Sequence, residues 1–154
     1  TNDGPMASAD TGTTSENAAI TIDVLANDTD LDASDTLTVA AVEARATNGT
    51  VYNNGSDVSY DPGSAYDYLA VGETATDTFR YTLSDGQGGT DTATVTVTIT
   101  GTNDGPMATA DTGTSDENAA ITIDVLANDT DLDATDRLTV SSVDTSATNG
   151  SVCY

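Results

Sequence analysis

The sequence contains no histidine, no lysine and no tryptophan, and its 3 basic residues are all arginines. Many enzymes use histidine or lysine as the general base or the covalent nucleophile, and neither is available here. Paired carboxylates, on which glycosidases rely, are abundant. Aromatic residues, however, are limited to 1 phenylalanine and 6 tyrosines, which is few for a site that holds sugars. The composition therefore argues against an enzyme.

Positive charge is nearly absent, because 26 acidic and 3 basic residues give a net charge of −23 in 154 residues. Nucleic acids and anionic membrane surfaces are poor partners for such a chain, since both need basic residues for binding. A single cysteine, Cys153, excludes an internal disulfide, and no apolar run is long enough to span a membrane. The sequence opens within a repeated pattern and without a signal peptide, so we expect it to be part of a longer protein.

The first part of the sequence returns after a shift of 101 positions. Thr1–Asn53 aligns with Thr102–Tyr154, and 40 of the 53 pairs are identical. A unit of about 100 residues is too long for a solenoid repeat and has the size of an autonomous domain. We therefore expect a complete domain in residues 1–101 and the first half of a second domain in residues 102–154.

Two hairpins are predicted within the repeat. In Thr76–Thr100, apolar and polar residues alternate on both sides of the turn-forming segment Ser84–Gly89. Gly49–Pro62 is predicted to form the second hairpin, with Asn53–Gly55 as its turn. These segments favour antiparallel β-structure.

The rest of the repeat also favours strands over helices. Ala18–Asp28 and Asp35–Ala44 each hold a short apolar or alternating run. Ser64–Glu73 is compatible with a short helical turn or with an irregular crossover between two sheets, and we favour the crossover. A total of about seven strands without a convincing helix predicts an all-β fold, a Greek-key β-sandwich.

Aspartates are concentrated in Asn27–Asp35, where no basic residue accompanies them. Asp28, Asp30 and Asp32 alternate along this stretch, and the second repeat contains the same three. Two carboxylates about 4 Å apart repel each other by roughly 4 kcal/mol at an effective dielectric constant near 20. Calcium, which binds about 6–8 oxygen ligands, would remove this repulsion. A calcium site is therefore expected; the alternative is a solvated acidic loop.

Two familiar calcium motifs do not fit this stretch. Asp28, Asp30 and Asp32 match the opening of an EF-hand loop, but Ala33 replaces its glycine and Val39 its bidentate glutamate. The glycine-rich nonapeptide repeat has one weak echo at Gly86–Asp91, which does not iterate.

Longer motifs resemble a known family. Val24–Val39 (VLANDTDLDASDTLTV), Val71–Pro106 (VGETATDTFRYTLSDGQGGTDTATVTVTITGTNDGP) and the acidic junction between the repeats are similar to VCBS-type, cadherin-like repeats. Such repeats occur in large bacterial surface proteins and secreted RTX adhesins. The resemblance covers both units, and it implies an immunoglobulin-like or cadherin-like sandwich in tandem, stiffened by calcium outside the cell.

The resemblance also implies a set of calcium ligands. In cadherins, a glutamate near the first strand, an acidic motif at the base of one domain, an Asn-Asp linker and an Asp-x-Asp loop of the next domain share calcium ions. The basal acidic motif has no clear match here, although Glu73 or Asp77 could substitute for it. The expected ligands across the junction are Glu16, Asn103, Asp104, Asp129 and Asp131. The other expected ligands are Asn2, Asp3, Asp28, Asp30, Asp32, Asp85, Glu117 and Asp133.

Two functions remain open. The first is a calcium-stiffened spacer, stalk or fibre module, whose partners are calcium and neighbouring repeats. The second is a module that binds a glycan or a protein, for which exposed aromatic residues should cluster. The tyrosines are spread over several segments, which favours the spacer, although Tyr66 and Tyr68 lie close together.

The half repeat needs additional strands. Residues 102–154 would carry only the first strands of a sandwich, and apolar residues such as Ile121, Ile123 and Val125 would lack a cover. We expect this cover to come from a neighbouring copy, which would build a fibre, or from further sequence of the same protein.

Overall fold

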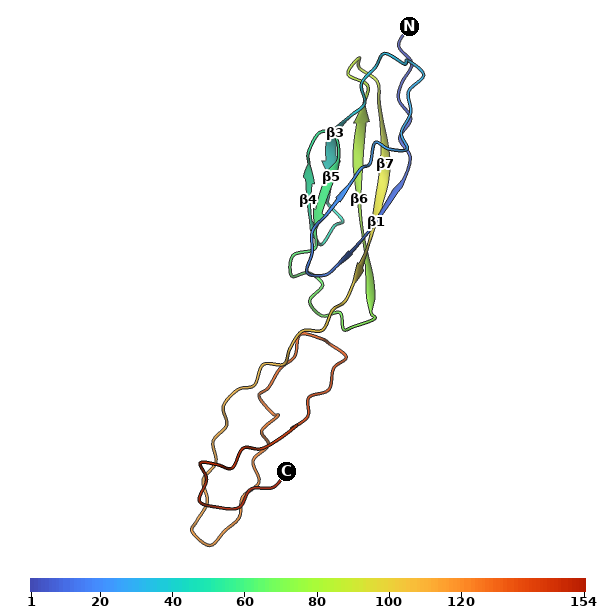
Figure 1. Ribbon diagram of the computed structural model, residues 1–154. Coiled ribbons are helices and arrows are strands. Elements are labelled where there is room, and N and C mark those ends of the chain that lie inside the picture. Colours follow the sequence, from blue (N-terminus) through green and yellow to red (C-terminus); the bar gives the residue numbers. More distant parts are fainter.

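The chain forms two units that lie end to end, and the structure, a computed structural model, describes all residues from 1 to 154 (Figure 1). Residues 1–101, the first repeat, form a sandwich of two β-sheets. Residues 102–154, the second repeat, continue from the end of the last strand. The structure contains no helix that is long and apolar enough to cross a membrane.

The sandwich of the first repeat has seven strands and no helix, which confirms the predicted all-β fold. One sheet has four strands in the order β1-β7-β6-β3, and the other has three in the order β2-β5-β4. The strands are β1 (Asp10–Ser15), β2 (Ile20–Ile22), β3 (Thr38–Glu43), β4 (Thr50–Asn53), β5 (Val58–Asp61), β6 (Thr74–Ser84) and β7 (Thr90–Thr100).

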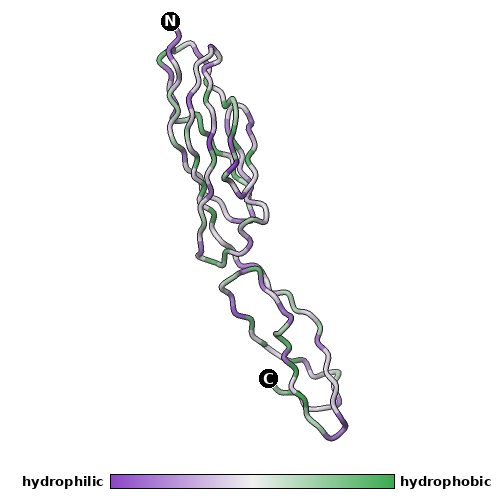
Figure 2. The backbone as a smooth tube through the Cα atoms, turned by 180° about the vertical axis from the view of Figure 1, so that it is seen from behind, coloured by the Kyte–Doolittle hydropathy of each residue, from purple (hydrophilic) through white to green (hydrophobic).

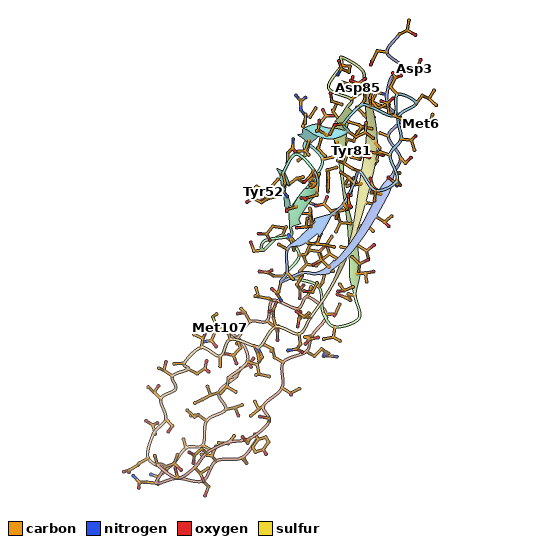
Figure 3. All side chains as sticks on the ribbon, turned by 45° about the horizontal axis from the view of Figure 1, so that its top comes forward. Asp3, Met6, Tyr52, Tyr81, Asp85 and Met107 are labelled. Carbon is orange, nitrogen blue, oxygen red and sulfur yellow. The ribbon has the colours of Figure 1, made fainter.

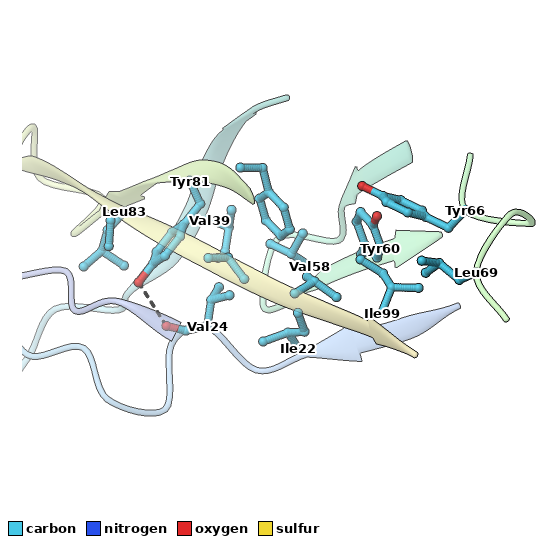
Figure 4. Packing of buried hydrophobic residues seen from close by; sticks show 14 residues of the cluster. Ile22, Val24, Val39, Val58, Tyr60, Tyr66, Leu69, Tyr81, Leu83 and Ile99 are labelled. Carbon is cyan, nitrogen blue, oxygen red and sulfur yellow. Dashed lines mark hydrogen bonds between the residues drawn. The ribbon is translucent and has the colours of Figure 1, made fainter. Parts of the chain in front are cut away.

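Both predicted hairpins are confirmed. β6 and β7 pair along their whole length, and β4 pairs with β5. Along β7, alanine, valine and isoleucine are buried at alternate positions while the threonines between them face outward. This alternation places one face of each strand in the core, which includes Tyr60 (Figure 4). Tyr60 stacks on Phe79 there.

The segment Ser64–Glu73 is a crossover, as predicted, and forms a series of turns without a helix. It leads from β5 in one sheet to β6 in the other. Its central part, Tyr66–Val71, lies at the end of the sandwich nearest to the second repeat, and we call it the base segment. Leu69 and Tyr66 of this segment are buried in the core.

The parallel pairing of β1 with β7 was not predicted from the sequence. Asp10 lies opposite Val95 and Ser15 opposite Thr100, so the two strands end together. Glu16, directly after β1, consequently lies beside the start of the connection to the second repeat, and its N–H donates to Thr100 O at 3.0 Å. This pairing places the end of β1 and Glu16 at the junction.

Residues 102–154 form no strand, although their sequence nearly repeats that of 1–53. The chain path is similar, because the backbone bridge between Met6 and Thr29 recurs between Met107 and Thr130. The two units differ in what packs against these residues. In the first repeat they are covered by β5, β6 and β7, and the half repeat has no counterpart of these strands. Hydrophobic positions occur along both units (Figure 2), but Ile123 is 42% exposed whereas Ile22 is 7% exposed.

Candidate metal centre

Glu16 is the most deeply buried acid at the junction, with 0% exposure. Its Oε1 accepts hydrogen bonds from the N–H of Thr102 at 2.7 Å and from the Thr102 hydroxyl at 2.8 Å. Its Oε2 is inaccessible to solvent and has no partner. A buried carboxylate oxygen without a partner is unfavourable, so this atom is a candidate cation ligand.

Asp133 approaches the junction from the second repeat and is 1% exposed. Its Oδ2 accepts the N–H of Asp104 at 2.9 Å, while its Oδ1 is buried without a partner. Asp104, in the connection between the repeats, also has a buried oxygen without a partner, Oδ2. Three carboxylates from three separate segments therefore each have a buried oxygen that lacks a hydrogen-bond partner.

Electrostatic repulsion links these groups. Burial raises the pKa of Asp104 above its usual value, and the negative charges of Glu16 and Asp133 raise it further. Asp67 and Asp131 contribute in the same direction. None of these acids is in an ion pair, since the one salt bridge of the chain joins Arg45 to Glu43.

We call these five acids the junction cluster: Glu16, Asp67, Asp104, Asp131 and Asp133. The only side-chain atoms of this cluster that could bind a metal are carboxylate oxygens. Such oxygens suit hard cations such as calcium and do not suit metals that prefer sulfur or imidazole. A cation bound near these carboxylates would reduce the repulsion between them.

A second group of acids lies at the N-terminal end of the first repeat, where Figure 3 shows Asp3 and Asp85. One carboxylate oxygen from each of Asp30, Asp35 and Asp85 lies within 4.8 Å of the others. The Oδ2 atoms of Asp30 and Asp35 are buried without partners. Burial raises the pKa of Asp35, and the charges of Asp32 and Asp30 add to this effect.

Hydrogen bonds hold Asn2 and Asp3 against this second group of acids. Asn2 Nδ2 donates to Asp85 Oδ2 at 2.9 Å, and Asp3 N donates to Asp32 Oδ2 at 2.7 Å. The latter bond is the equivalent of the one from Asp104 N to Asp133 Oδ2. The two ends thus share one local structure.

The two ends differ in what covers them. Asp133 is buried against the base of the first repeat, whereas the equivalent Asp32 is only half-buried. Leu132 is likewise less exposed than Leu31, at 59% against 84%. Contact with the base of a neighbouring repeat therefore completes the burial of this acidic loop.

Several predicted ligands lie elsewhere or make other contacts. Both oxygens of Asp28 accept the Tyr81 hydroxyl, at 2.9 and 2.8 Å, which gives Asp28 a structural role inside the sandwich. Asn103 is exposed and its side chain donates to Asp104 O. Asp129 Oδ1 accepts the N–H of Thr109.

The glutamate of the second repeat, Glu117, corresponds to Glu16 but is exposed. Its side chain accepts a hydrogen bond from the neighbouring Asn118 at 3.3 Å. The environment of Glu16 depends on β7 and the connection that follows it, and the half repeat has no counterpart of either. Glu117 therefore lacks the neighbours that make Glu16 a candidate ligand.

Asp67, which supplies the acid at the base of the first repeat, was not predicted from the sequence. The substitutes considered there have other roles: Asp77 is buried and accepts hydrogen bonds from Gly49 N and the Tyr60 hydroxyl, and Glu73 accepts the N–H of Ala70. The sequence shows only that Asp67 lies between two tyrosines in a crossover. Its position beside the junction, which makes it a candidate ligand, is visible only in the structure.

Comparison with known proteins agrees with this architecture. The family model described as a bacterial Ig domain matches residues 2–98 and again residues 103–154. The comparison with curated proteins found no match. Among solved structures, the chain is similar to a nucleoside hydrolase-related hypothetical protein from Saccharophagus degradans, whose description associates it with carbohydrate metabolism.

That structural similarity is distant, with 18% sequence identity and a TM-score of 0.42. It covers 65% of this chain and 26% of the other, so the chain spans about a quarter of the length of that protein. The family match, in contrast, includes nearly every residue of both repeats. The chain belongs to the bacterial immunoglobulin-domain family.

Proposed function

We propose that the chain is part of a calcium-stiffened spacer or stalk of a bacterial surface or secreted protein. A bacterial immunoglobulin-like domain is a structural module, and the two repeats lie end to end in an elongated arrangement (Figure 1). Calcium would act at the connection, where it would restrict the movement of one repeat relative to the next.

The observation that carries this proposal is the pair of buried, unpartnered oxygens at the junction, Glu16 Oε2 and Asp133 Oδ1. They belong to different repeats, so a cation bound by both would hold the repeats together. Extracellular calcium modules typically bind with a Kd of about 10⁻⁴–10⁻³ M. This range fits a location outside the cell, which we propose for the parent protein.

The alternative function, a module that binds a glycan or a protein, receives less support. Tyr52 and Tyr68 are exposed, but Tyr52 lies on β4 and Tyr68 in the base segment next to the second repeat. Exposed aromatic residues of the first repeat therefore do not form one surface. Figure 3 shows Tyr52 on the flank of the sandwich.

Calcium titration of the full chain tests the proposed function. A spin label on Cys153, which is exposed, and a second on the exposed position 87 after Gln87→Cys would report the distance between the repeats. Calcium should narrow the distance distribution and raise the melting temperature, because at 100-fold excess over Kd one site adds about 2.7 kcal/mol. If chelation changes neither quantity, the proposal is wrong.

A matched pair of variants separates the junction from the N-terminal end. Asp133→Asn should abolish the narrowing of the distance distribution by calcium. Asp32→Asn, the same change in the first repeat, should preserve this narrowing, because no base segment contacts Asp32 in this chain. Equal effects of the two variants would contradict a site at the junction.

A further inference from the structure

We infer that the base segment, Tyr66–Val71, is the element that aligns the following repeat. It acts through two neighbouring groups, the carboxylate of Asp67 and the backbone carbonyl of Tyr68. The role of Asp67 rests on the proposed function, since it requires a cation. The role of the Tyr68 carbonyl does not, because that group accepts a direct hydrogen bond from the second repeat.

The base segment is firmly attached to the sandwich of the first repeat. Tyr66 is 3% exposed, and its hydroxyl accepts a hydrogen bond from Asn48 Nδ2 at 3.3 Å. Leu69 and Ala70 are also buried, and Leu69 N donates to Tyr66 O at 3.0 Å. Between these anchors, Asp67 and Tyr68 are held at the surface in a defined position.

The connection between the repeats starts against the same segment. Gly101 N donates to Glu73 O at 2.9 Å. A Cβ atom at position 101 would collide with the carbonyl oxygens of Leu69 and Ala70. The chain therefore leaves the first repeat in close contact with the base segment, which restricts its direction.

The backbone of Tyr68 contacts the acidic loop of the second repeat directly. Its carbonyl accepts the N–H of Ala134 at 3.1 Å. Ala134 directly follows Asp133, the buried acid of the junction cluster, and Asp133 N in turn donates to Asp131 Oδ1 at 3.1 Å. One hydrogen bond thus positions the loop that supplies two of the candidate ligands.

Asp67 lies next to this hydrogen bond in the chain. It is half-buried and directly precedes Tyr68, whose carbonyl accepts the hydrogen bond from Ala134. A cation bound by Asp67 and the loop of the second repeat would act on the same contact as the Tyr68 carbonyl. Alignment and cation binding would then be coupled through two adjacent residues.

Proline substitution of Ala134 removes the donor of this bond with little local disturbance. Asp136 N donates to Asp133 O at 3.1 Å, so Ala134 is the second residue of a turn, a position that suits proline. The first repeat has the same turn, with Asp35 N donating to Asp32 O at 2.9 Å. Ala33→Pro is consequently a matched control that removes no contact between repeats.

The doubly spin-labelled chain described above tests the alignment. Ala134→Pro should broaden the distance distribution between positions 87 and 153 both with and without calcium, whereas Ala33→Pro should leave it as in the unsubstituted chain. Distributions that coincide for Ala134→Pro and the unsubstituted chain under both conditions would overturn the role of the Tyr68 carbonyl. This outcome can be read even if the chain binds no calcium.

Calcium affinity tests the role of Asp67. Asp67→Asn should weaken calcium binding at the junction by about tenfold or more, through the loss of one charged ligand, and should leave the calcium-free distance distribution unchanged. Asp116→Asn, at an exposed position of the second repeat, is the control and should bind calcium normally. An unchanged calcium affinity of Asp67→Asn would remove Asp67 from the site. If neither chain binds calcium, the proposed function itself has failed.

Discussion

At the scale of single residues, the acids of the first repeat have two different roles. The Tyr81 hydroxyl donates to the carboxylate of Asp28 and lies 3.1 Å from Val24 O (Figure 4), so it links β6 to the opposite side of the sandwich. Asp10 lies near this group, and its Oδ2 is buried without a partner. Burial raises the pKa of Asp10 to about 6, and the charge of Asp28 adds to the shift.

This raised pKa predicts a pH dependence of stability. Because folded Asp10 holds its proton up to about pH 6, whereas the ordinary pKa of an aspartate is 3.8, the free energy of unfolding should fall as pH rises through this window. Asp10→Asn should remove that contribution and make the first repeat more stable than the unsubstituted chain at pH 7. Denaturant unfolding between pH 4 and pH 7, with pH values chosen at roughly one-unit steps, measures the difference.

The control for this prediction is Asp111→Asn. Asp111 occupies the same position in the second repeat, but it is exposed. Its substitution should leave the pH dependence of unfolding unchanged. If Asp10→Asn and the unsubstituted chain have parallel pH profiles, Asp10 does not titrate with a raised pKa.

At the scale of elements, the sequence predicted what depends on local pattern. Alternation and turn residues predicted the hairpins β4–β5 and β6–β7, and the crossover was favoured over a short helical turn. The parallel pairing of β1 with β7 joins residues about 85 positions apart, as the hydrogen bond from Thr102 to Glu16 also does, and no local pattern encodes it.

The difference between local and long-range contacts also explains which site residues could be predicted from the sequence. Glu16, Asp104 and Asp131 were predicted as ligands across the junction, and the charges of Glu16 and Asp131 both raise the pKa of Asp104. Asp67 was missed because the contact of the adjacent Tyr68 with the second repeat depends on the tertiary structure. Asp28 lies in the same acidic stretch as Asp30, and the sequence could not show that Tyr81, more than 50 residues away, occupies its oxygens.

The contact between Gly101 and the base segment makes a prediction about this element. Gly101→Ala should destabilise the first repeat by about 1–3 kcal/mol, because the added methyl group must displace the carbonyls of Leu69 and Ala70. Thermal unfolding measures the effect. Gly105→Ala is the control within the same connection, since no atom lies within 4 Å of the place that its added Cβ would take, and it should have little effect. Equal melting temperatures for the two variants would contradict the close contact.

At the scale of the whole molecule, the open feature is the uncovered face of the second repeat. Val125 is 38% exposed, whereas Val24, its equivalent, is completely buried beneath the opposite sheet. The chain contains the N-terminal half of the domain twice, in residues 1–53 and 102–154, and the C-terminal half once. A second copy that covered the exposed face with its own β5–β7 would uncover its own first repeat, so this exchange adds no buried surface.

A segment of the same kind as residues 54–101, supplied in addition, is therefore the cover that we propose for the second repeat. A copy of residues 54–101 joined after Tyr154, which aligns with Asn53, should fold onto residues 102–154. Its tyrosine equivalent to Tyr81 would then reach Asp129, as Tyr81 reaches Asp28. In the extended chain, the amide hydrogens of Ile123 and Val125 should exchange slowly, because global unfolding would be needed to expose them.

The control is the same extended chain in which the counterparts of Val95 and Val97 in the added segment are replaced by aspartate. These valines are completely buried in the first repeat, so the added charges should prevent the segment from covering the apolar face. Fast exchange at Ile123 and Val125 should then persist, as in the chain of 154 residues. Slow exchange in the unextended chain, accompanied by a dimer mass in solution, would show instead that a second copy provides the cover.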